Sequence, residues 1–189
     1  ICKELKRAFN LETNRIIIQI APGSGKSEIL RHWVAFCFAH YPDSQFIYCS
    51  YSKDLAAQST AIIKDIVSLP FYRKIFGIKI RQDSSAKSNF ILETTDGRPG
   101  GVQLYAAGSA GTITGFNAGL PITDRFSGAC VMDDMHKPDE VFSDNIRGGI
   151  ISNYNLNIEK RPRSPNEPIV WISPDRVSDP NSGCSGESR

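Results

Sequence analysis

The stretch IIIQIAPGSGKSE, residues 16–28, joins an apolar run to a lysine and a serine through a short glycine-rich turn. It meets the phosphate-loop pattern G-x-x-x-x-G-K-[ST] at Gly25, Lys26 and Ser27, but has Ile20 in place of the first glycine. A triphosphate needs backbone N–H groups with little side-chain bulk around them, and a glycine turn before a helix supplies such groups. Lys26 would then reach the β- and γ-phosphates, and the Ser27 hydroxyl would bind Mg²⁺.

The whole loop is a candidate ATP site, in which Pro22 and Gly23 would make the turn that the absent first glycine usually makes. The residues expected to contact the nucleotide are Pro22, Gly23, Ser24, Gly25, Lys26, Ser27 and Glu28. The structural alternative is an ordinary strand-to-helix connection with a surface lysine. The apolar run before the loop and the helical pattern after it favour the phosphate loop.

A second motif, ACVMDD at residues 129–134, is an apolar strand that ends in two acids. Asp133 would hold Mg²⁺ through its water shell, and Asp134 would orient the attacking water or accept its proton. Strands that end in an Asp-Asp turn are common, so this motif is weak by itself. Because a nucleotide site needs both halves, the two motifs together support the hypothesis better than either does alone.

Strand and helix patterns alternate along the chain, which predicts an α/β fold with a mainly parallel central sheet flanked by helices. We expect strands at 16–20, 45–50, 89–94, 101–108, 128–134 and 169–173, and helices at 1–12, 26–40, 53–68 and 139–158. Strand 16–20 is apolar enough to be buried on both faces, and 89–94 with 101–108 form a β-hairpin insertion. Ligands of parallel sheets bind at the carboxyl ends of strands, where both motifs lie.

The bulk composition is that of one globular domain, with 189 residues, of which 40% are hydrophobic and 22% charged. We assign residues 1–173 to that domain and expect 174–189 to be an irregular or disordered tail. The formal net charge of +2 permits nucleic-acid binding without arguing for it. Cys37, Cys49 and Cys130 lie in apolar runs, so we expect buried, reduced thiols. No apolar run is long enough to span a bilayer, and no signal peptide is recognisable.

With both motifs placed, the chain resembles the ATPase domain of a bacteriophage terminase large subunit, the motor that packages DNA. Five stretches carry the resemblance over about residues 14–173, in matching order and spacing: IAPGSGKSEIL, FIYCSYSKDLAAQ, SLPFYRKIFGIKI, GSAGTITGFNAG and VMDDMHKPDEVFSD. The resemblance implies a P-loop NTPase of the ASCE or RecA-like type that hydrolyses Mg-ATP to translocate double-stranded DNA. It also implies a ring of subunits in the bacterial host cytoplasm, with a portal protein and a small terminase subunit as partners.

The resemblance assigns roles to single positions. Lys26 and Ser27 match the phosphate-loop lysine and the Mg²⁺ serine, and Asp133 and Asp134 match the Walker B aspartate and the catalytic carboxylate. Ser173 matches the coupling residue that senses the γ-phosphate.

The loop of these ATPases often carries an arginine where this chain has Gly23, so nucleotide binding is a firmer expectation than fast hydrolysis. Arg15, Arg125 and Arg147 are alternative sources of that charge. The nuclease domain of terminases has no counterpart in residues 1–189, so we expect no DNA cleavage from this chain. Two alternatives stay open: another P-loop ATPase of the helicase-like kind, and a degenerate nucleotide-binding domain with little hydrolysis.

Overall fold

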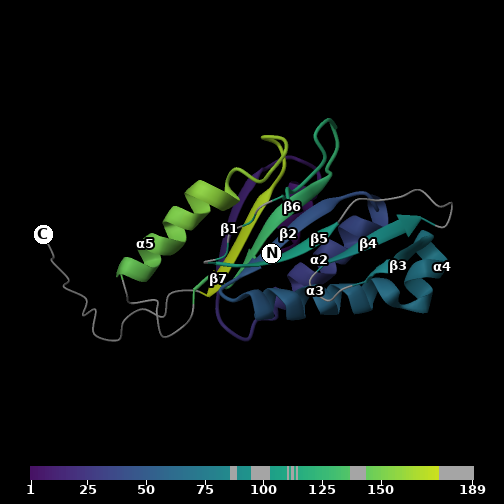
Figure 1. The fold of residues 1–189 in the computed structure, drawn as a ribbon, viewed down its shortest axis with the longest axis horizontal. Helices are drawn as coiled ribbons and strands as arrows, with labels where there is room; N and C mark the ends of the chain where they lie inside the picture. Colours follow the sequence, from purple (N-terminus) through teal and green to yellow (C-terminus); the bar gives the residue numbers. More distant parts are fainter. Residues whose placement is uncertain are drawn as a thin grey trace, which may run out of the picture.

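The computed structural model describes residues 1–85, 89–94, 103–109, 111, 113, 115–136 and 144–174. Among these residues one sheet has the strand order β1-β7-β6-β2-β5-β4-β3 (Figure 1). Its strands are β1 (Arg15–Ile20), β2 (Gln45–Ser50), β3 (Ile78–Ser85), β4 (Asn89–Thr94), β5 (Leu104–Gly108), β6 (Gly128–Asp133) and β7 (Ile169–Pro174). The helices are α1 (Cys2–Phe9), α2 (Lys26–His40), α3 (Lys53–Ser68), α4 (Pro70–Phe76) and α5 (Asp144–Asn153), followed by the π-helical turn η2 (Tyr154–Ile158).

The sheet is mainly parallel, as the alternating pattern predicts. β1 pairs with β7, β7 with β6, β6 with β2, and β2 with β5, all in parallel. At one edge β4 runs antiparallel to both β5 and β3. The pairing of β4 with β5 confirms the expected antiparallel pair, although residues 95–102 between them lie outside the described residues. The structure is therefore an α/β fold, and its mixed sheet has an antiparallel extension at one edge.

Local signals set the ends of α3 and the start of α4. Ser52 caps α3, because its hydroxyl accepts a hydrogen bond from the Leu55 N–H at 3.3 Å. α3 ends at Ser68, and Pro70 begins α4, because proline is tolerated in the first turn of a helix but not in its interior. α4 and β3 were not among the predicted elements. Gly77, with φ of 65°, ends α4 and turns the chain directly into β3.

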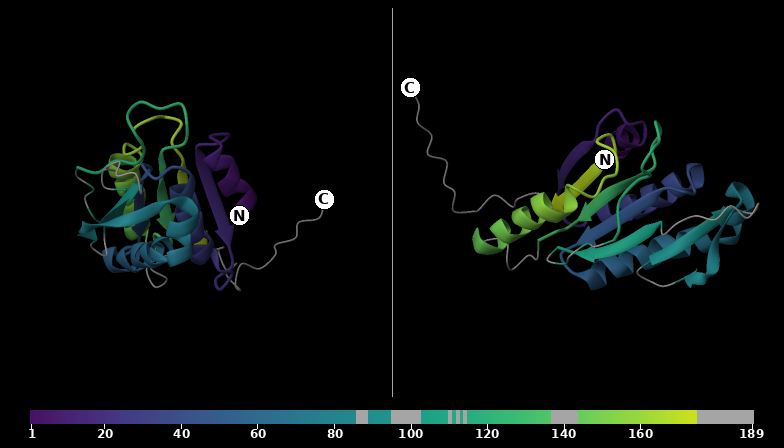
Figure 2. Two further views of the ribbon diagram at one scale, coloured as in Figure 1. Left: turned by 90° about the vertical axis from the view of Figure 1, so that its right-hand side faces the viewer. Right: turned by 45° about the horizontal axis from the view of Figure 1, so that its top comes forward.

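Alternation along the central strands divides the core between the two faces of the sheet. On β2, Phe46 and Tyr48 pack with the buried sides of α1, α2 and α3, whereas Ile47 and Cys49 face the other way. The second face is covered by α5 and η2 through Ile150 and Ile158, and Figure 2 shows α5 away from α2 and α3. The three thiols expected to be buried are buried and free: Cys37, Cys49 and Cys130.

The expectation that β1 is buried on both faces is wrong. Ile16 is buried, but the side chain of Ile17 is 73% exposed and Gln19 is exposed as well. β1 lies at the edge of the sheet, with β7 as its one neighbour among the described residues. Because α5 and η2 pack over the more central strands, the Ile17 face of β1 stays open to solvent there.

The expected helix over 139–158 is shorter and less regular in the structure. α5 covers Asp144–Asn153, with Gly148 and Gly149 inside it, and η2 continues to Ile158. Residues 137–143 lie outside the described residues, as do residues 175–189 of the expected tail. Pro174, which we placed at the start of that tail, is the last residue of β7.

Candidate functional site

The glycine loop joins the carboxyl end of β1 to the first turn of α2. Gly23 and Gly25 have φ values of 77° and 74°, a left-handed conformation that side chains with a Cβ disfavour. A Cβ added to either glycine would meet no atom within 4 Å, so the space beside the loop is open. Gly25 is the N-cap of α2 and offers no capping side chain, and the first amides of a helix have no acceptor within it. The loop therefore exposes backbone donors beside open space.

Lys26 follows this loop and turns toward the end of β6. The residue is only 7% exposed, and its Nζ lies 2.9 Å from Oδ1 of Asp134. Asp134 is held next to β7, because its N–H donates to the carbonyl of Ile172 at 3.1 Å. Its φ is 48°, a left-handed value that aspartate tolerates better than most residues do. The two sequence motifs thus meet through an ion pair between their charged groups.

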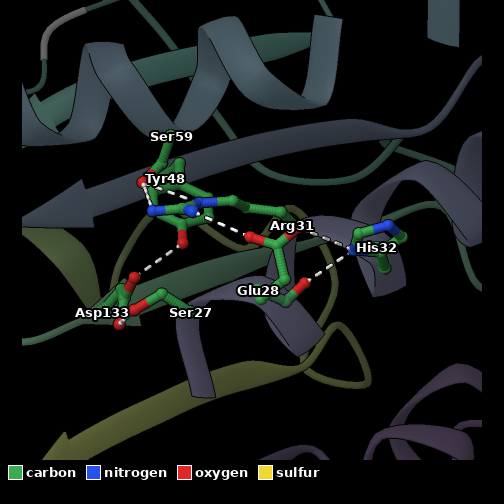
Figure 3. A network of polar contacts seen from close by, with 7 residues as sticks. All are labelled: Ser27, Glu28, Arg31, His32, Tyr48, Ser59 and Asp133. Atoms are coloured by element: carbon green, nitrogen blue, oxygen red, sulfur yellow. Dashed lines mark hydrogen bonds and ion pairs between the residues drawn. The ribbon is translucent and has the colours of Figure 1, made fainter. Parts of the chain in front are cut away.

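Ser27 makes the second contact between the motifs. Its hydroxyl donates to Oδ1 of Asp133 at 3.0 Å, across 106 positions in the sequence. The other oxygen, Oδ2, accepts a hydrogen bond of 2.9 Å from the hydroxyl of Tyr48 on β2 (Figure 3). Asp133 is 5% exposed and Tyr48 is fully buried. Each oxygen of this carboxylate therefore has a hydroxyl donor.

Burial and hydrogen bonding have opposite effects on the pKa of Asp133, whereas burial and the contact with Asp133 both raise the pKa of Tyr48. Burial raises the pKa of Asp133 above its ordinary value, the charge of Asp134 raises it further, and hydrogen bonds from Ser27 and Tyr48 lower it. Burial and the charge of Asp133 also raise the pKa of Tyr48 well above its usual range. Tyr48 is therefore neutral at physiological pH and keeps its proton as a donor to Asp133.

Arg31 extends the contacts from α2 to α3. It lies one turn after Ser27, and its Nε and one terminal nitrogen are 3.4 and 3.3 Å from the Ser59 hydroxyl. Its other terminal nitrogen pairs with Glu28 at 3.1 Å. The positive charge of Arg31 lowers the pKa of Asp133, so it stabilises the ionised carboxylate. Figure 3 shows the contacts of Arg31 with Ser59 and Glu28 beside the hydrogen bond between Tyr48 and Asp133.

The remaining sequence-predicted residues occupy different places around the site. Pro22 and Ser24 are exposed in the loop, and the carboxylate of Glu28 is engaged by Arg31. Ser173 reaches the same edge of the sheet, where it pairs with Gln19 of β1. Alternation along β7 puts Ser173 on the face of Trp171, whereas Asp133 lies on the face of α2. The structure thus joins the lysine, serine and aspartates, and leaves Ser173 on the opposite face.

Two of the three arginines considered as sources of positive charge lie at the opposite end of the strands from the glycine loop. Arg15 is the first residue of β1, and Arg125 precedes β6. Arg125 pairs with Asp43 at 2.6 Å and stacks 4.5 Å from the centre of the Tyr41 ring. The side chain of Arg147 lies outside the described residues. Neither Arg15 nor Arg125 is placed to act on the phosphate loop of its own chain.

Sequence reasoning missed Tyr48, Arg31 and Ser59. Two signals pointed toward them. A tyrosine inside a buried strand needs a partner for its hydroxyl, and a residue four positions after Ser27 lies on the same face of a helix. Neither signal identifies the partner, because these contacts join elements that are far apart in the sequence.

The described residues contain no cluster of three or more histidine, cysteine, aspartate or glutamate side chains that could hold a metal ion by themselves. Mg²⁺ at nucleotide sites uses one or two protein ligands together with phosphate oxygens and water. Ser27 and Asp133 fit that smaller set, because they lie side by side next to an open loop.

Within the described ranges, no helix combines the length and the apolar composition that a membrane span requires. No protein-family model matches the chain, and no curated protein matches it.

Proposed function

We propose that this chain is a P-loop ATPase domain of the ASCE or RecA-like type, and that it hydrolyses Mg-ATP. The observation that carries the proposal is the pair of contacts between the two motifs, Ser27 with Asp133 and Lys26 with Asp134. Each motif alone is common. A lysine and a serine after a bare glycine turn, joined to two carboxylates at a strand end, form the polar set that phosphoryl transfer requires.

The nucleotide phosphates would bind over the loop. The backbone donors of residues 23–28 would surround them, and Lys26 would supply a positive charge. The open space beside Gly23 and Gly25 supports this placement, because no side chain of the described residues fills it. Lys26 would exchange its contact with Asp134 for the phosphates.

Ser27 and Asp133 would hold Mg²⁺. The Ser27 hydroxyl already donates its proton to Asp133, so the lone pairs of its oxygen remain for a cation. Bound there, Mg²⁺ would neutralise charge on the β- and γ-phosphate oxygens.

Asp134 would act on the attacking water. As a carboxylate at the mouth of the site, with its side chain 36% exposed, it can orient a water molecule and accept its proton. Water then attacks the γ-phosphorus, the bond to the β-phosphate oxygen breaks, and ADP and phosphate leave. Ser173 stays a proposed γ-phosphate sensor by resemblance. It would need to act from the carboxyl end of β7, the strand between β1 and β6.

The motor role rests on the resemblance to terminase large subunits. It comprises translocation of double-stranded DNA, a ring of subunits, a portal protein and a small terminase subunit as partners, and the bacterial host cytoplasm as the location. In such a ring a neighbouring subunit could supply the positive charge that Gly23 does not. Arg15 and Arg125, at the opposite end of the strands from the glycine loop, would be available only in that way.

The degenerate domain is the second candidate, and two observations favour it. In the structure Lys26 and Asp134 neutralise each other, and the loop has no arginine at Gly23. The experiment is ATP binding and phosphate release by the purified chain, with and without Mg²⁺ and DNA. Binding with turnover supports the ATPase, binding without turnover under every condition supports the degenerate domain, and absence of binding rejects both.

A further inference from the structure

We propose that Tyr48 is a positioning residue for the metal-binding carboxylate: it fixes Asp133 so that the Ser27 side of that carboxylate faces the nucleotide. Nothing in the sequence motifs assigns this role. The inference rests on the proposed function, because it concerns the Mg²⁺ half of the same site.

The geometry at Asp133 carries the argument. Tyr48 donates to Oδ2 at 2.9 Å, and Ser27 donates to Oδ1 at 3.0 Å. A carboxylate on a single Cβ can rotate about its last bond unless both oxygens are held. Because Tyr48 holds the oxygen away from Ser27, the Oδ1 side remains next to the loop.

Tyr48 is suited to this task because its ring cannot move easily. It is fully buried on β2, a central strand with β6 on one side and β5 on the other. β2 pairs directly with β6, in a register that places Tyr48 opposite Val131, two residues before Asp133. The hydroxyl therefore reaches the strand end from a fixed base within the sheet.

Arg31 and Ser59 support the same arrangement from outside the sheet. Arg31 bonds to Ser59 on α3, and Ser59 is buried beside the network. The charge of Arg31 lies close enough to act on both Tyr48 and Asp133. Hydrogen bonds from Ser27 of α2 and Tyr48 of β2 therefore hold one carboxylate, and Ser59 of α3 holds the arginine whose charge acts on it.

The test measures how nucleotide binding depends on Mg²⁺ in Tyr48→Phe. A fluorescent ATP analogue is titrated into each protein at a series of Mg²⁺ concentrations and, separately, in EDTA. We expect the Mg²⁺ concentration for half-maximal effect to rise about 10-fold or more, as for other residues that orient metal ligands. The affinity measured in EDTA should stay unchanged, because Lys26 and the loop are untouched.

Tyr72→Phe is the matched control. Tyr72 is also buried, and its hydroxyl donates to the Ala35 carbonyl at 2.7 Å, about two helical turns along α2 from Ser27. Both substitutions remove one buried hydrogen bond, so both should lower the melting temperature. Only Tyr48→Phe should change the Mg²⁺ requirement. An equal Mg²⁺ requirement in the wild type and Tyr48→Phe would overturn the inference.

Ser59→Ala covers the case in which Tyr48→Phe does not fold. It removes the partner of Arg31 with a small change in volume, and we expect a smaller shift of the Mg²⁺ requirement in the same direction. If Tyr48→Phe is unfolded and Ser59→Ala behaves as the wild type, the positioning network is rejected. The wild-type arm reports separately on the proposed function: without Mg²⁺-dependent binding there, the ATPase assignment fails, and the inference fails with it.

Discussion

Nζ of Lys26 lies 2.9 Å from Oδ1 of Asp134, so the lysine of the glycine loop and the second acid of β6 form an ion pair. Lys26 is nearly buried, whereas the side chain of Asp134 is 36% exposed. A triphosphate that binds over the loop offers Lys26 a larger negative charge than one carboxylate does. Nucleotide binding should therefore release Asp134 at the moment when a base beside the γ-phosphate is needed.

Asp134→Asn should separate binding from hydrolysis. Asparagine tolerates the left-handed backbone at this position, where φ is 48°, so the fold should be kept. Without the opposing charge, Lys26 is free for the phosphates, and ATP affinity should equal or exceed that of the wild type. Hydrolysis should fall about 10²–10⁴-fold, because the base is lost. Calorimetry and phosphate release measure the two effects. Unchanged turnover in this variant would show that Asp134 is not the base.

Gly25→Ala should weaken nucleotide binding with only a modest loss of stability. The backbone at Gly25 is left-handed, so a Cβ costs about 1–2 kcal/mol in free energy of unfolding. The added methyl group would also enter the open space where we expect phosphate. Gly77→Ala is the control, since Gly77 has a similar φ of 65° but ends α4, away from the loop. The cradle hypothesis is rejected if both variants bind ATP as the wild type does.

Ser27→Ala should raise the Mg²⁺ concentration that ATP binding requires. The variant loses the hydroxyl that bonds to Asp133 and that we propose as a metal ligand. Ser24→Ala provides the comparison, because Ser24 is exposed in the loop and is expected to act through its backbone. Titration of Mg²⁺ at fixed ATP should show a shift of about 10-fold or more for Ser27→Ala alone. Equal shifts in both variants would argue against a specific role for Ser27.

Glu167→Gln should change how stability depends on pH. Burial raises the pKa of Glu167 above its ordinary value of 4.5, and the hydrogen bond from Ser127 opposes the rise only in part. The folded protein therefore holds this proton at a higher pH than the unfolded chain does. The stabilisation that protonated Glu167 provides is fully present below pH 4.5, and it is lost as pH rises through the pKa of this group in the folded protein.

The measurement is urea unfolding of the wild type and Glu167→Gln across this pH range. Glutamine does not titrate, so the difference in unfolding free energy should be constant at low pH and should shift in favour of the variant as pH rises. Parallel pH profiles would mean that Glu167 titrates normally. ATP binding should be unaffected, since Glu167 lies just before β7, at the edge opposite the glycine loop.

The sequence predicts those parts of the site whose residues are adjacent in the chain. Gly25, Lys26 and Ser27 are consecutive, and the acids follow directly from an apolar strand. The role of Tyr48 was not predictable, because its partner Asp133 lies 85 positions away and the contact depends on β2 pairing with β6. The local sequence pattern predicts that Tyr48 is buried, but the order of the strands decides which side chain its hydroxyl contacts.

The difference between local pattern and strand order also explains where the predicted fold was wrong. β1 reads as a fully buried strand because its residues are apolar, yet its place at the sheet edge leaves Ile17 exposed. Edge position follows from topology, which a single apolar run does not encode. α4 has only seven residues and directly precedes β3, so its periodicity is too short to stand out.

ATP binding by the wild type and Lys26→Ala, measured by calorimetry in the presence of Mg²⁺, tests the central claim most directly. Lys6→Ala removes an exposed lysine of α1 and controls for the change in net charge. We predict that the wild type and Lys6→Ala bind ATP with equal affinity, and that Lys26→Ala loses binding while staying folded. Equal binding by all three proteins, or no binding by the wild type, would contradict the assignment of this loop as a phosphate site.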